Sequence, residues 1–301
     1  MRSRFLGFAA AILALPLTAP AIVWRHDVGD AAYINFGNQF QSVGYVQNVA
    51  TGSFGSGTLI GSNWVLTAWH VVEGSGGPAS NWRFGVNGTE YTASNVFLRT
   101  PPLQGFASVV NAGQDLALIQ LNTNVTGVTP SQLFNGSVTL GTQGAMVGYG
   151  LNGPGTGTSG TRAIDGQRRA ATNLIELYAT LGGSGITGST TPTRTVISDF
   201  DAPTGFGPNQ FGTAAPEGLE GNVDSGDSGG GLFFNVGGSW QLAGVTSFKG
   251  GDGGYGGISG WNLVQPEIAW INSITAIPEP TTMTVLALGA LAALRRKRKS
   301  A

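Results

Sequence analysis

The chain contains no cysteine, so its fold cannot include a disulfide bond. Histidine occurs only twice, and charged side chains make up 10% of the 301 residues. Without cysteine, and with its two histidines far apart, the sequence has none of the ligand patterns of a zinc site. It also lacks an EF-hand loop and a nucleotide-binding motif. No metal site and no cofactor is therefore expected, and calcium bound by a loop stays an open alternative without a motif to support it.

Sustained helical periodicity is almost absent, whereas glycine is abundant, with 50 residues. Short apolar and β-branched runs alternate with clusters of Gly, Asn, Ser and Thr, a pattern typical of strands separated by turns. The predicted strands are 42–49, 58–60, 65–68, 116–121, 145–149, 232–235 and 241–247. Their regular spacing favours an all-β fold built from closed barrels.

The two chain ends have the composition of targeting segments. Residues 1–21 contain two arginines, an apolar core and small residues before a cleavage position, which predicts a secretory signal peptide cut after Ala21. Residues 278–301 begin with Pro-Glu-Pro, continue with 14 mainly apolar positions at 281–294 and end in a basic cluster. This apolar stretch is shorter than the roughly 20 residues of a permanent span, so only transient membrane association is expected.

Removal of both ends leaves eight Lys and Arg against fifteen Asp and Glu, a net charge near −7. An acidic domain argues against nucleic acid as a partner, since phosphates favour a basic surface. The charge does not identify a substrate, because an acidic surface also serves solubility. A domain of about 250 residues buries enough surface to fold without disulfides.

Segment 226–230, Gly-Asp-Ser-Gly-Gly, carries the strongest chemical signal. Small neighbours leave the Ser228 hydroxyl accessible and leave backbone N–H groups free to face a reacting carbonyl. A serine nucleophile also needs a base and a group that orients the base. His70 ends one apolar segment and Asp115 opens another, so the order along the chain is His, Asp, Ser.

Together these segments resemble those of the trypsin-like (chymotrypsin-fold) serine proteases. Segment 57–70 resembles the strand that leads to the catalytic histidine, and 115–121 resembles the catalytic-aspartate segment. Segment 244–248 resembles the strand that lines the specificity pocket, and Trp270-Ile271 matches a pair in the terminal helix. The resemblance covers roughly residues 22–274.

The resemblance implies two six-stranded antiparallel β-barrels with the active site between them, followed by a short C-terminal helix. The expected parts are a first barrel at about 22–147, a linking loop at 148–160, a second barrel at about 161–265 and a helix at 266–273. This helix is the only one expected in the mature domain, with Pro266 in its first turn. His70 and Asp115 then come from the first barrel and Ser228 from the second.

The resemblance further implies a triad in which Ser228 is the nucleophile, His70 the base and Asp115 the residue that orients the base. The N–H groups of Gly226 and Ser228 are expected to form the oxyanion hole. Taken alone, His70 would fit a protein core and Asp115 the start of a strand, and the combination of motifs favours catalysis. The expected activity is that of an exported serine endopeptidase. The alternative is a catalytically silent binding module of the same fold, because Trp69 stands where the family usually has alanine.

Alignment with the family assigns Asn222, Ser247, Phe248, Lys249 and Ser259 to substrate binding. Asn222 occupies the pocket-base position at which trypsin carries an aspartate, so a strong preference for Lys or Arg is not expected. The backbone of Ser247 is expected to hydrogen-bond the substrate strand. Lys249 either favours an acidic substrate residue or points to solvent. The nearby Asp224, Glu217 and Glu220 could instead compensate a basic substrate, so the residue preference stays open.

In many relatives the aspartate before the nucleophile pairs with a newly formed N-terminal ammonium group, often on an Ile-Val pair. Cleavage after Ala21 would expose Ile22-Val23. This predicts that signal removal activates the enzyme through a pair between Ile22 and Asp227. The alternative is that Asp227 accepts only local hydrogen bonds.

The C-terminal segment resembles the PEP-CTERM sorting signal of Gram-negative bacteria, which directs export and then cleavage near the Pro-Glu-Pro motif by an exosortase. The expected processing partners are thus a signal peptidase and an exosortase-type enzyme, beside a protein or peptide substrate. The expected destination is the cell surface, the extracellular matrix or the medium.

Overall fold

The computed structural model describes residues 21–74, 77–100, 104–183, 185–203, 209–213 and 215–275. The strands are β1 (Val23–Trp24), β2 (Val43–Asn48), β3 (Phe54–Gly61), β4 (Trp64–Thr67), β5 (Trp82–Val86), β6 (Thr89–Leu98), β7 (Ala117–Leu121), β8 (Gln143–Gly148), β9 (Gly153–Pro154), β10 (Arg169–Leu174), β11 (Leu177–Gly182), β12 (Gly185–Ser189), β13 (Thr195–Asp199), β14 (Gly221–Asn222), β15 (Gly231–Val236), β16 (Ser239–Gly250) and β17 (Ile258–Leu263). The helices are α1 (Asp30–Gly37), α2 (Trp69–Val72), α3 (Phe106–Asn111) and α4 (Ile268–Thr275), with 3₁₀ turns η1 (Ala79–Asn81), η2 (Ser159–Thr161) and η3 (Gln265–Glu267). The predicted signal peptide, apart from Ala21, and the predicted sorting tail lie outside the described residues.

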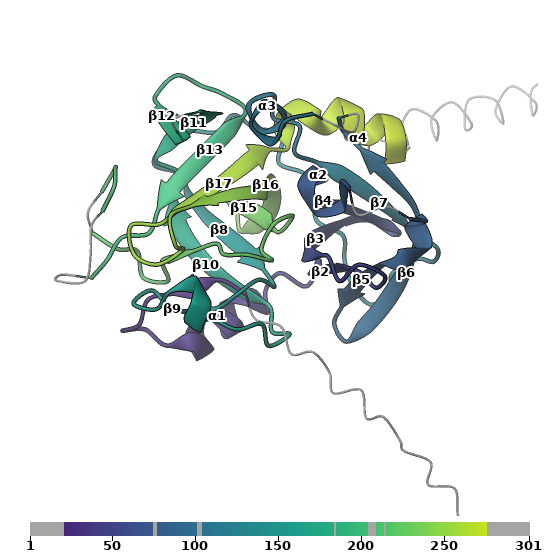
Figure 1. Ribbon diagram of the computed structural model, residues 1–301, viewed down its shortest axis with the longest axis horizontal. Coiled ribbons are helices and arrows are strands. Elements are labelled where there is room, and N and C mark those ends of the chain that lie inside the picture. Colours follow the sequence, from purple (N-terminus) through teal and green to yellow (C-terminus); the bar gives the residue numbers. More distant parts are fainter. Residues whose placement is uncertain are drawn as a thin grey trace, which may run out of the picture.

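The first half of the chain forms a closed barrel in the order β2-β3-β4-β7-β6-β5, seen at the right of Figure 1. Every residue of β4 is buried, and Val65 and Leu66 join Leu59 in the fully buried core. Asn87 and Gly88 connect β5 to β6 with positive φ values of 48° and 77°. A two-residue type I′ hairpin needs positive φ at both positions, which explains the Asn-Gly pair.

The second half forms one eight-stranded sheet in the order β10-β8-β15-β16-β17-β13-β11-β12. The all-β fold, with its barrel and its short C-terminal helix, is confirmed; eight joined strands stand where six were expected. Strand β8 pairs with β10 and β15, so the chain crosses between the halves at 122–142 rather than in the predicted loop 148–160. The high glycine content of residues 148–160 suggested that the linking loop lies there. The second sheet nevertheless begins earlier, at β8, because β8 pairs with strands that come later in the chain.

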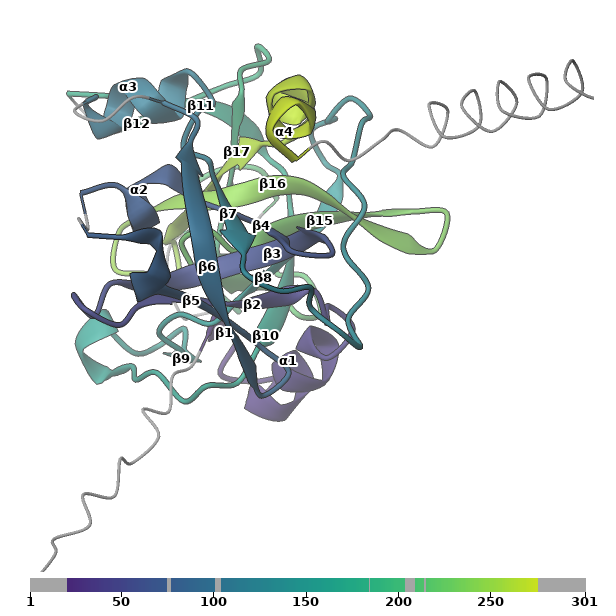
Figure 2. The ribbon, with the colours of Figure 1, turned by 90° about the vertical axis from the view of Figure 1, so that its right-hand side faces the viewer.

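Three helices precede α4 in the described ranges, although the sequence predicts no other helix in the mature domain. They have only eight, four and six residues, too few to produce a clear helical period. Helix α1 packs on β10, where Arg169 Nη2 donates to Asp30 Oδ2 at 2.7 Å. Figures 1 and 2 show α1 and α4 at opposite ends of the molecule. Within the described residues no helix has both the length and the apolar character that crossing a membrane requires.

A group of carboxyl side chains lies where β13 ends. Asp199, Asp201 and Glu220 are at most 3% exposed, and Glu176 is half-buried beside them. Backbone N–H groups serve as donors, from Asp199 to Glu176 Oε2 at 3.0 Å and from Asp201 to Glu220 Oε1 at 2.7 Å. Burial and the neighbouring carboxyl group of Asp199 raise the pKa of Glu176 to about 9. In the described ranges, no group of three or more acidic or histidine side chains is arranged to hold a metal ion.

The raised pKa of Glu176 predicts a loss of stability as the pH rises. Above about pH 4.3 the unfolded chain releases the Glu176 proton, whereas the folded state keeps it up to a pH of about 9. The contribution of Glu176 to the free energy of unfolding therefore falls as the pH rises through this range. Glu176→Gln keeps a neutral side chain and should flatten this decline in urea unfolding measured from about pH 5 to 9. The exposed Glu90 offers a control, since Glu90→Gln should keep the wild-type slope. Identical slopes in Glu176→Gln and wild type would contradict the shift.

Candidate active site

Both halves of the molecule supply the residues of the predicted triad. His70 lies in α2 directly after β4, and Asp115 lies just before β7, the strand that pairs with β4. Ser228 lies in the turn before β15. This turn is tied to the barrel because Ser56 of β3 donates its N–H to the carbonyl of Ser228 at 2.8 Å.

His70 and Asp115 form a close pair. His70 Nδ1 lies 2.8 Å from Oδ2 and 3.1 Å from Oδ1 of Asp115, and the His70 backbone N–H donates to Oδ1 at 3.0 Å. The Asp115 side chain is wholly buried, whereas 26% of the His70 side chain is exposed. These contacts hold the imidazole with Nδ1 occupied, which leaves Nε2 for another partner.

Two further residues position Asp115, and the sequence alone did not reveal their roles. Ser247 Oγ donates to Asp115 Oδ2 at 2.5 Å, while only its backbone had been assigned a role. Asn262 Oδ1 accepts the N–H of Asp115 at 2.9 Å, and its Nδ2 donates to the Val110 carbonyl at 3.0 Å. The sequence signal for Asn262 was an amide between the apolar residues Trp261 and Leu263, in what the structure shows to be strand β17.

The turn before β15 leaves two backbone donors unused. In the described part of the chain, the N–H groups of Gly226 and Ser228 donate no hydrogen bond, whereas those of Asp227 and Gly229 bond to backbone carbonyls. Gly226 has a φ of 93°, and a Cβ there would lie 2.9 Å from Gly150 Cα. Only glycine fits this position without strain.

The hydrogen bonds of His70 within the described residues all go to Asp115, and none joins Nε2 to Ser228 Oγ. Catalytic hydrogen bonds are often long without substrate and shorten in the complex. The structure thus brings His70 and Asp115 together and holds the Ser228 turn against β3. The contact between His70 and Ser228 stays a prediction.

Asp227 is completely buried, and its carboxylate accepts both local and distant hydrogen bonds. Oδ2 accepts the N–H of Asp224 at 2.9 Å and that of Ile22 at 3.3 Å, and Oδ1 accepts the N–H of Gly150 at 2.7 Å. Burial raises the pKa of Asp227 to about 7. Ile22 is fully buried and has a φ of 62°, a strained value for a β-branched residue.

The residues aligned with the pocket base bond mainly to one another. Ser259 Oγ donates to Asn222 Oδ1 and accepts the N–H of Val223 at 3.0 Å. Asn222 and Ser259 are wholly buried. Phe248 lies against Gly260, where a Cβ would come within 2.3 Å of the ring. The base of this region is therefore neutral and its polar groups are largely satisfied.

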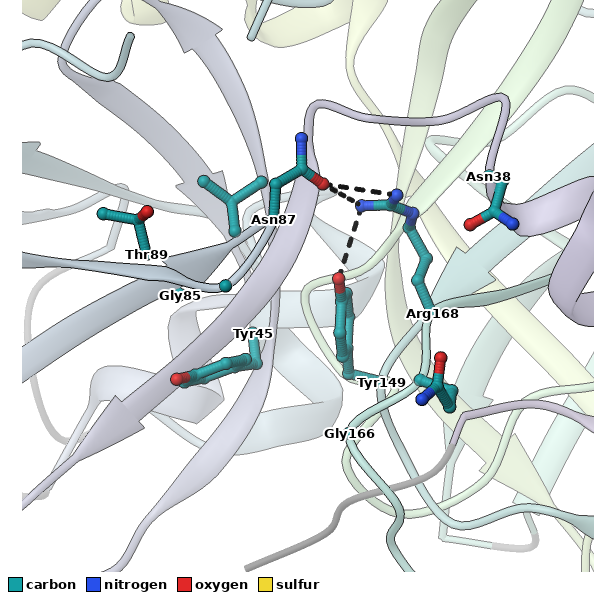
Figure 3. Close-up of a pocket in the computed structure, with 11 residues that line it drawn as sticks. Asn38, Tyr45, Gly85, Asn87, Thr89, Tyr149, Gly166 and Arg168 are labelled. Atoms are coloured by element: carbon teal, nitrogen blue, oxygen red, sulfur yellow. Dashed lines mark hydrogen bonds between the residues drawn. The ribbon is translucent and has the colours of Figure 1, made fainter. Parts of the chain in front are cut away.

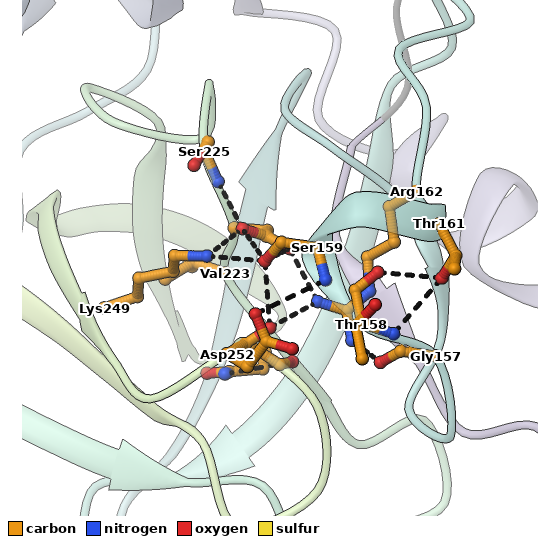
Figure 4. A network of polar contacts seen from close by, with 12 residues as sticks. Gly157, Thr158, Ser159, Thr161, Arg162, Val223, Ser225, Lys249 and Asp252 are labelled. Atoms are coloured by element: carbon orange, nitrogen blue, oxygen red, sulfur yellow. Dashed lines mark hydrogen bonds and ion pairs between the residues drawn. The ribbon is translucent and has the colours of Figure 1, made fainter.

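A buried ion network lies beside the nucleophile turn in this chain without cysteine (Figure 4). Arg162 Nη1 lies 2.6 Å from Asp224 Oδ2, and both side chains are fully buried. Lys249 Nζ pairs with Asp224 Oδ1 and donates to Ser159 Oγ at 2.9 Å. Asp224 and Ser159 therefore hold the Lys249 ammonium group, which is neither fully solvated nor unpaired in a pocket.

Removal of the charge of Asp224 should strongly destabilise the fold. Asp224→Asn leaves the buried Arg162 without a counterion, and breaking such a pair costs about 3–5 kcal/mol. Asp27→Asn is the matched control, because the Arg25–Asp27 pair is partly exposed and should contribute about 1 kcal/mol or less. The free energy of unfolding, measured in urea, tests both variants. Equal losses in the two variants would show that burial does not matter here.

Trp69 and the other histidine of the chain, His26, take structural positions. His26 Nδ1 lies 2.7 Å from Tyr255 Oη, and the two rings meet edge to face. Trp69 is 3% exposed, so α2 accommodates its indole below the surface. The bulk of Trp69 therefore does not by itself disqualify the site.

Comparison with known protein families agrees with the geometry. The family model described as Trypsin matches residues 35–271, and the model described as PEP-CTERM protein-sorting motif matches residues 276–299, which lie beyond the described residues. None of the curated proteins compared with the chain matches it. The chain therefore belongs to the trypsin family and carries a PEP-CTERM sorting motif that indicates export.

Proposed function

We propose that this protein is an exported serine endopeptidase that hydrolyses peptide bonds through an acyl-enzyme intermediate. The observation that carries the proposal is the fully buried Asp115 carboxylate paired with Nδ1 of the partly exposed His70. A carboxylate removed from water and committed to one imidazole is the arrangement that a general base needs. Membership of the trypsin family supports the same chemistry.

Each side chain has a defined task in this mechanism. Ser228 Oγ attacks the substrate carbonyl while neutral His70 accepts its proton at Nε2. His70 then returns the proton to the leaving amine, and water attacks the acyl-enzyme in the second half of the reaction. Asp115 keeps the imidazole in the required tautomer and stabilises the imidazolium that forms.

The unused donors of Gly226 and Ser228 would form the oxyanion hole. A donor aimed at the developing negative charge stabilises the transition state by about 3 kcal/mol. The positive φ of Gly226 supports this role, since it turns the N–H group to an orientation that other residues rarely adopt.

Substrate recognition would use the Ser247 backbone, Phe248 and Lys249, with Asn222 and Ser259 at the pocket base. The neutral base disfavours a Lys or Arg preference, because no free carboxylate is offered there. Asp224 does not change this, since two cations already balance its charge.

A fluorophosphonate probe tests the proposal, since it reacts with an activated serine. Folded, processed wild type should be labelled, with the adduct located on Ser228 by mass spectrometry, and Ser228→Ala should remain unlabelled. Unlabelled wild type would favour the silent binding module, a reading that the lack of a His70–Ser228 hydrogen bond among the described contacts keeps open.

Activation would follow from signal removal. Cleavage after Ala21 converts the amide nitrogen of Ile22, 3.3 Å from Asp227 Oδ2, into an ammonium group. This positive charge would lower the pKa of Asp227 from its raised value of about 7 and hold the carboxylate ionised beside the Gly226 turn.

An alanine inserted between Ala21 and Ile22 should impair the processed enzyme. The ammonium group is displaced and the buried carboxylate loses it as a partner, so kcat/KM should fall by about 10²–10³-fold. Ile22→Val keeps the ammonium in place and should stay near wild type. Mass analysis must establish the new N-terminus in each case. An extended enzyme as active as wild type would refute activation by this pair.

Processing would give the final location. Signal peptidase would act after Ala21, and an exosortase-type enzyme would act near the Pro-Glu-Pro motif after transient membrane association. The product would lie at the cell surface, in the extracellular matrix or in the medium.

A further inference from the structure

A pocket of about 280 Å³ lies between the two halves of the molecule and shares no residue with the site described above (Figure 3). Tyr45 and Asn87 line it from the barrel, and Tyr149 and Arg168 line it from the second half. The lining contains one cation and no acidic residue. Glu90 follows the lining residue Thr89 but is exposed and is not part of the lining, and its carboxylate accepts a hydrogen bond from Tyr45 Oη at 2.5 Å.

The Arg168 guanidinium in this pocket has only neutral partners. Arg168 is 7% exposed. Its Nε donates to the Gly37 carbonyl and its Nη1 to the Val43 carbonyl, both at 2.9 Å. Nη1 also lies 3.3 Å from Tyr149 Oη, whereas Nη2 makes only a long contact of 3.5 Å with Asn87 Oδ1.

Two other buried arginines show how this chain balances such a charge elsewhere. Arg169 pairs with two carboxylates, those of Asp30 and Asp165, and Arg162 pairs with Asp224. No carboxylate lies within 4 Å of Arg168 in the described residues. Burial of a cation without an anion is costly. Arg168 is therefore a buried cation for which the described residues supply no counterion.

A second donor meets the same space. Burial raises the pKa of Tyr149, so its phenol keeps its proton at neutral pH. Tyr149 Oη accepts from Arg168, and within the described residues its O–H donates no hydrogen bond. Figure 3 shows the hydroxyl and the guanidinium facing one another beside Asn87.

We propose that this pocket binds a carboxylate, with Arg168 Nη2 and the Tyr149 O–H as its donors. A carboxylate accepts two such bonds at once and supplies the missing negative charge. The bound group would touch both halves and should therefore stabilise their arrangement. Its source is either a small organic acid or an acidic side chain of a peptide, which present the same chemistry.

Thermal unfolding of the full-length Ser228→Ala protein tests this inference independently of any hydrolysis. Sodium acetate at tenfold its Kd, the Kd being taken from calorimetric titration, should raise Tm by about 3 °C relative to sodium chloride of equal ionic strength. Acetate and a blocked aspartyl peptide are compared, and tighter binding of one identifies the source. Equal Tm values in chloride and in both carboxylates would overturn the proposal.

Three added substitutions separate binding from a general salt effect. Arg168→Gln should abolish the carboxylate-dependent shift. Tyr149→Phe keeps the ring and the arginine and should weaken carboxylate binding at least tenfold, which covers the case in which Arg168→Gln does not fold. Arg169→Gln removes a buried arginine that already has its carboxylates, so it should retain the shift. The same shift in Arg168→Gln or in Tyr149→Phe would contradict the assignment.

Discussion

Ser228→Ala is expected to lower kcat for a peptide substrate by about 10⁶-fold, close to complete loss of enzymatic hydrolysis. Without the hydroxyl no acyl-enzyme forms, and the remaining groups can only bind the substrate and stabilise charge. A discontinuous assay with a peptide library, analysed by mass spectrometry, would detect both the activity and its loss.

Ser225→Ala is the matched control for this substitution. Ser225 lies in the same turn and is exposed, and its backbone N–H, which the substitution leaves in place, donates to Asp224 Oδ1 at 2.7 Å. Activity should therefore stay within about twofold of wild type, as expected for a surface substitution. Undiminished hydrolysis by a folded Ser228→Ala protein would remove the serine mechanism altogether.

Asp115→Asn is expected to lower kcat by about 10⁴-fold while the fold is retained. The amide has nearly the shape of the carboxylate, but its NH₂ group cannot accept a hydrogen bond. The carboxylate accepts at both oxygens, from the His70 backbone N–H at Oδ1 and from His70 Nδ1 and Ser247 Oγ at Oδ2. The imidazole then loses its required tautomer. Steady-state kinetics with parallel urea unfolding would separate loss of catalysis from loss of structure.

Ser247→Ala provides a graded comparison, because it removes one hydrogen bond and keeps the carboxylate of Asp115. A hydrogen bond to a charged group contributes about 1.5–3 kcal/mol, so kcat should fall by about 10–100-fold in Ser247→Ala. If Asp115→Asn cost no more than Ser247→Ala, orientation of the histidine would not depend on the negative charge.

Much of the fold could be predicted from apolar runs of strand length. A half-buried strand alternates apolar and polar residues, and a fully buried strand is a short continuous apolar run, so both leave a local pattern in the sequence. Strand β4 and the hairpin turn at Asn87-Gly88 follow from such local chemistry. The short helices could not be predicted because they have too few residues for a clear helical period. The assignment of β8 to the second sheet could not be predicted because it depends on pairing with strands that come later in the chain. Pairing of β8 with β10 and β15 is settled by contacts between distant segments.

The sequence by itself determined the family, the order of His70, Asp115 and Ser228 and the sorting motif, because these depend on residue type and spacing. Only the tertiary structure decided that Ser247 and Asn262 position Asp115 and that Arg162, Lys249 and Asp224 form an ion network beside the nucleophile turn. It also decided which buried arginine lacks a carboxylate. The physical reason is that burial and charge pairing arise only when segments far apart in the chain are packed together.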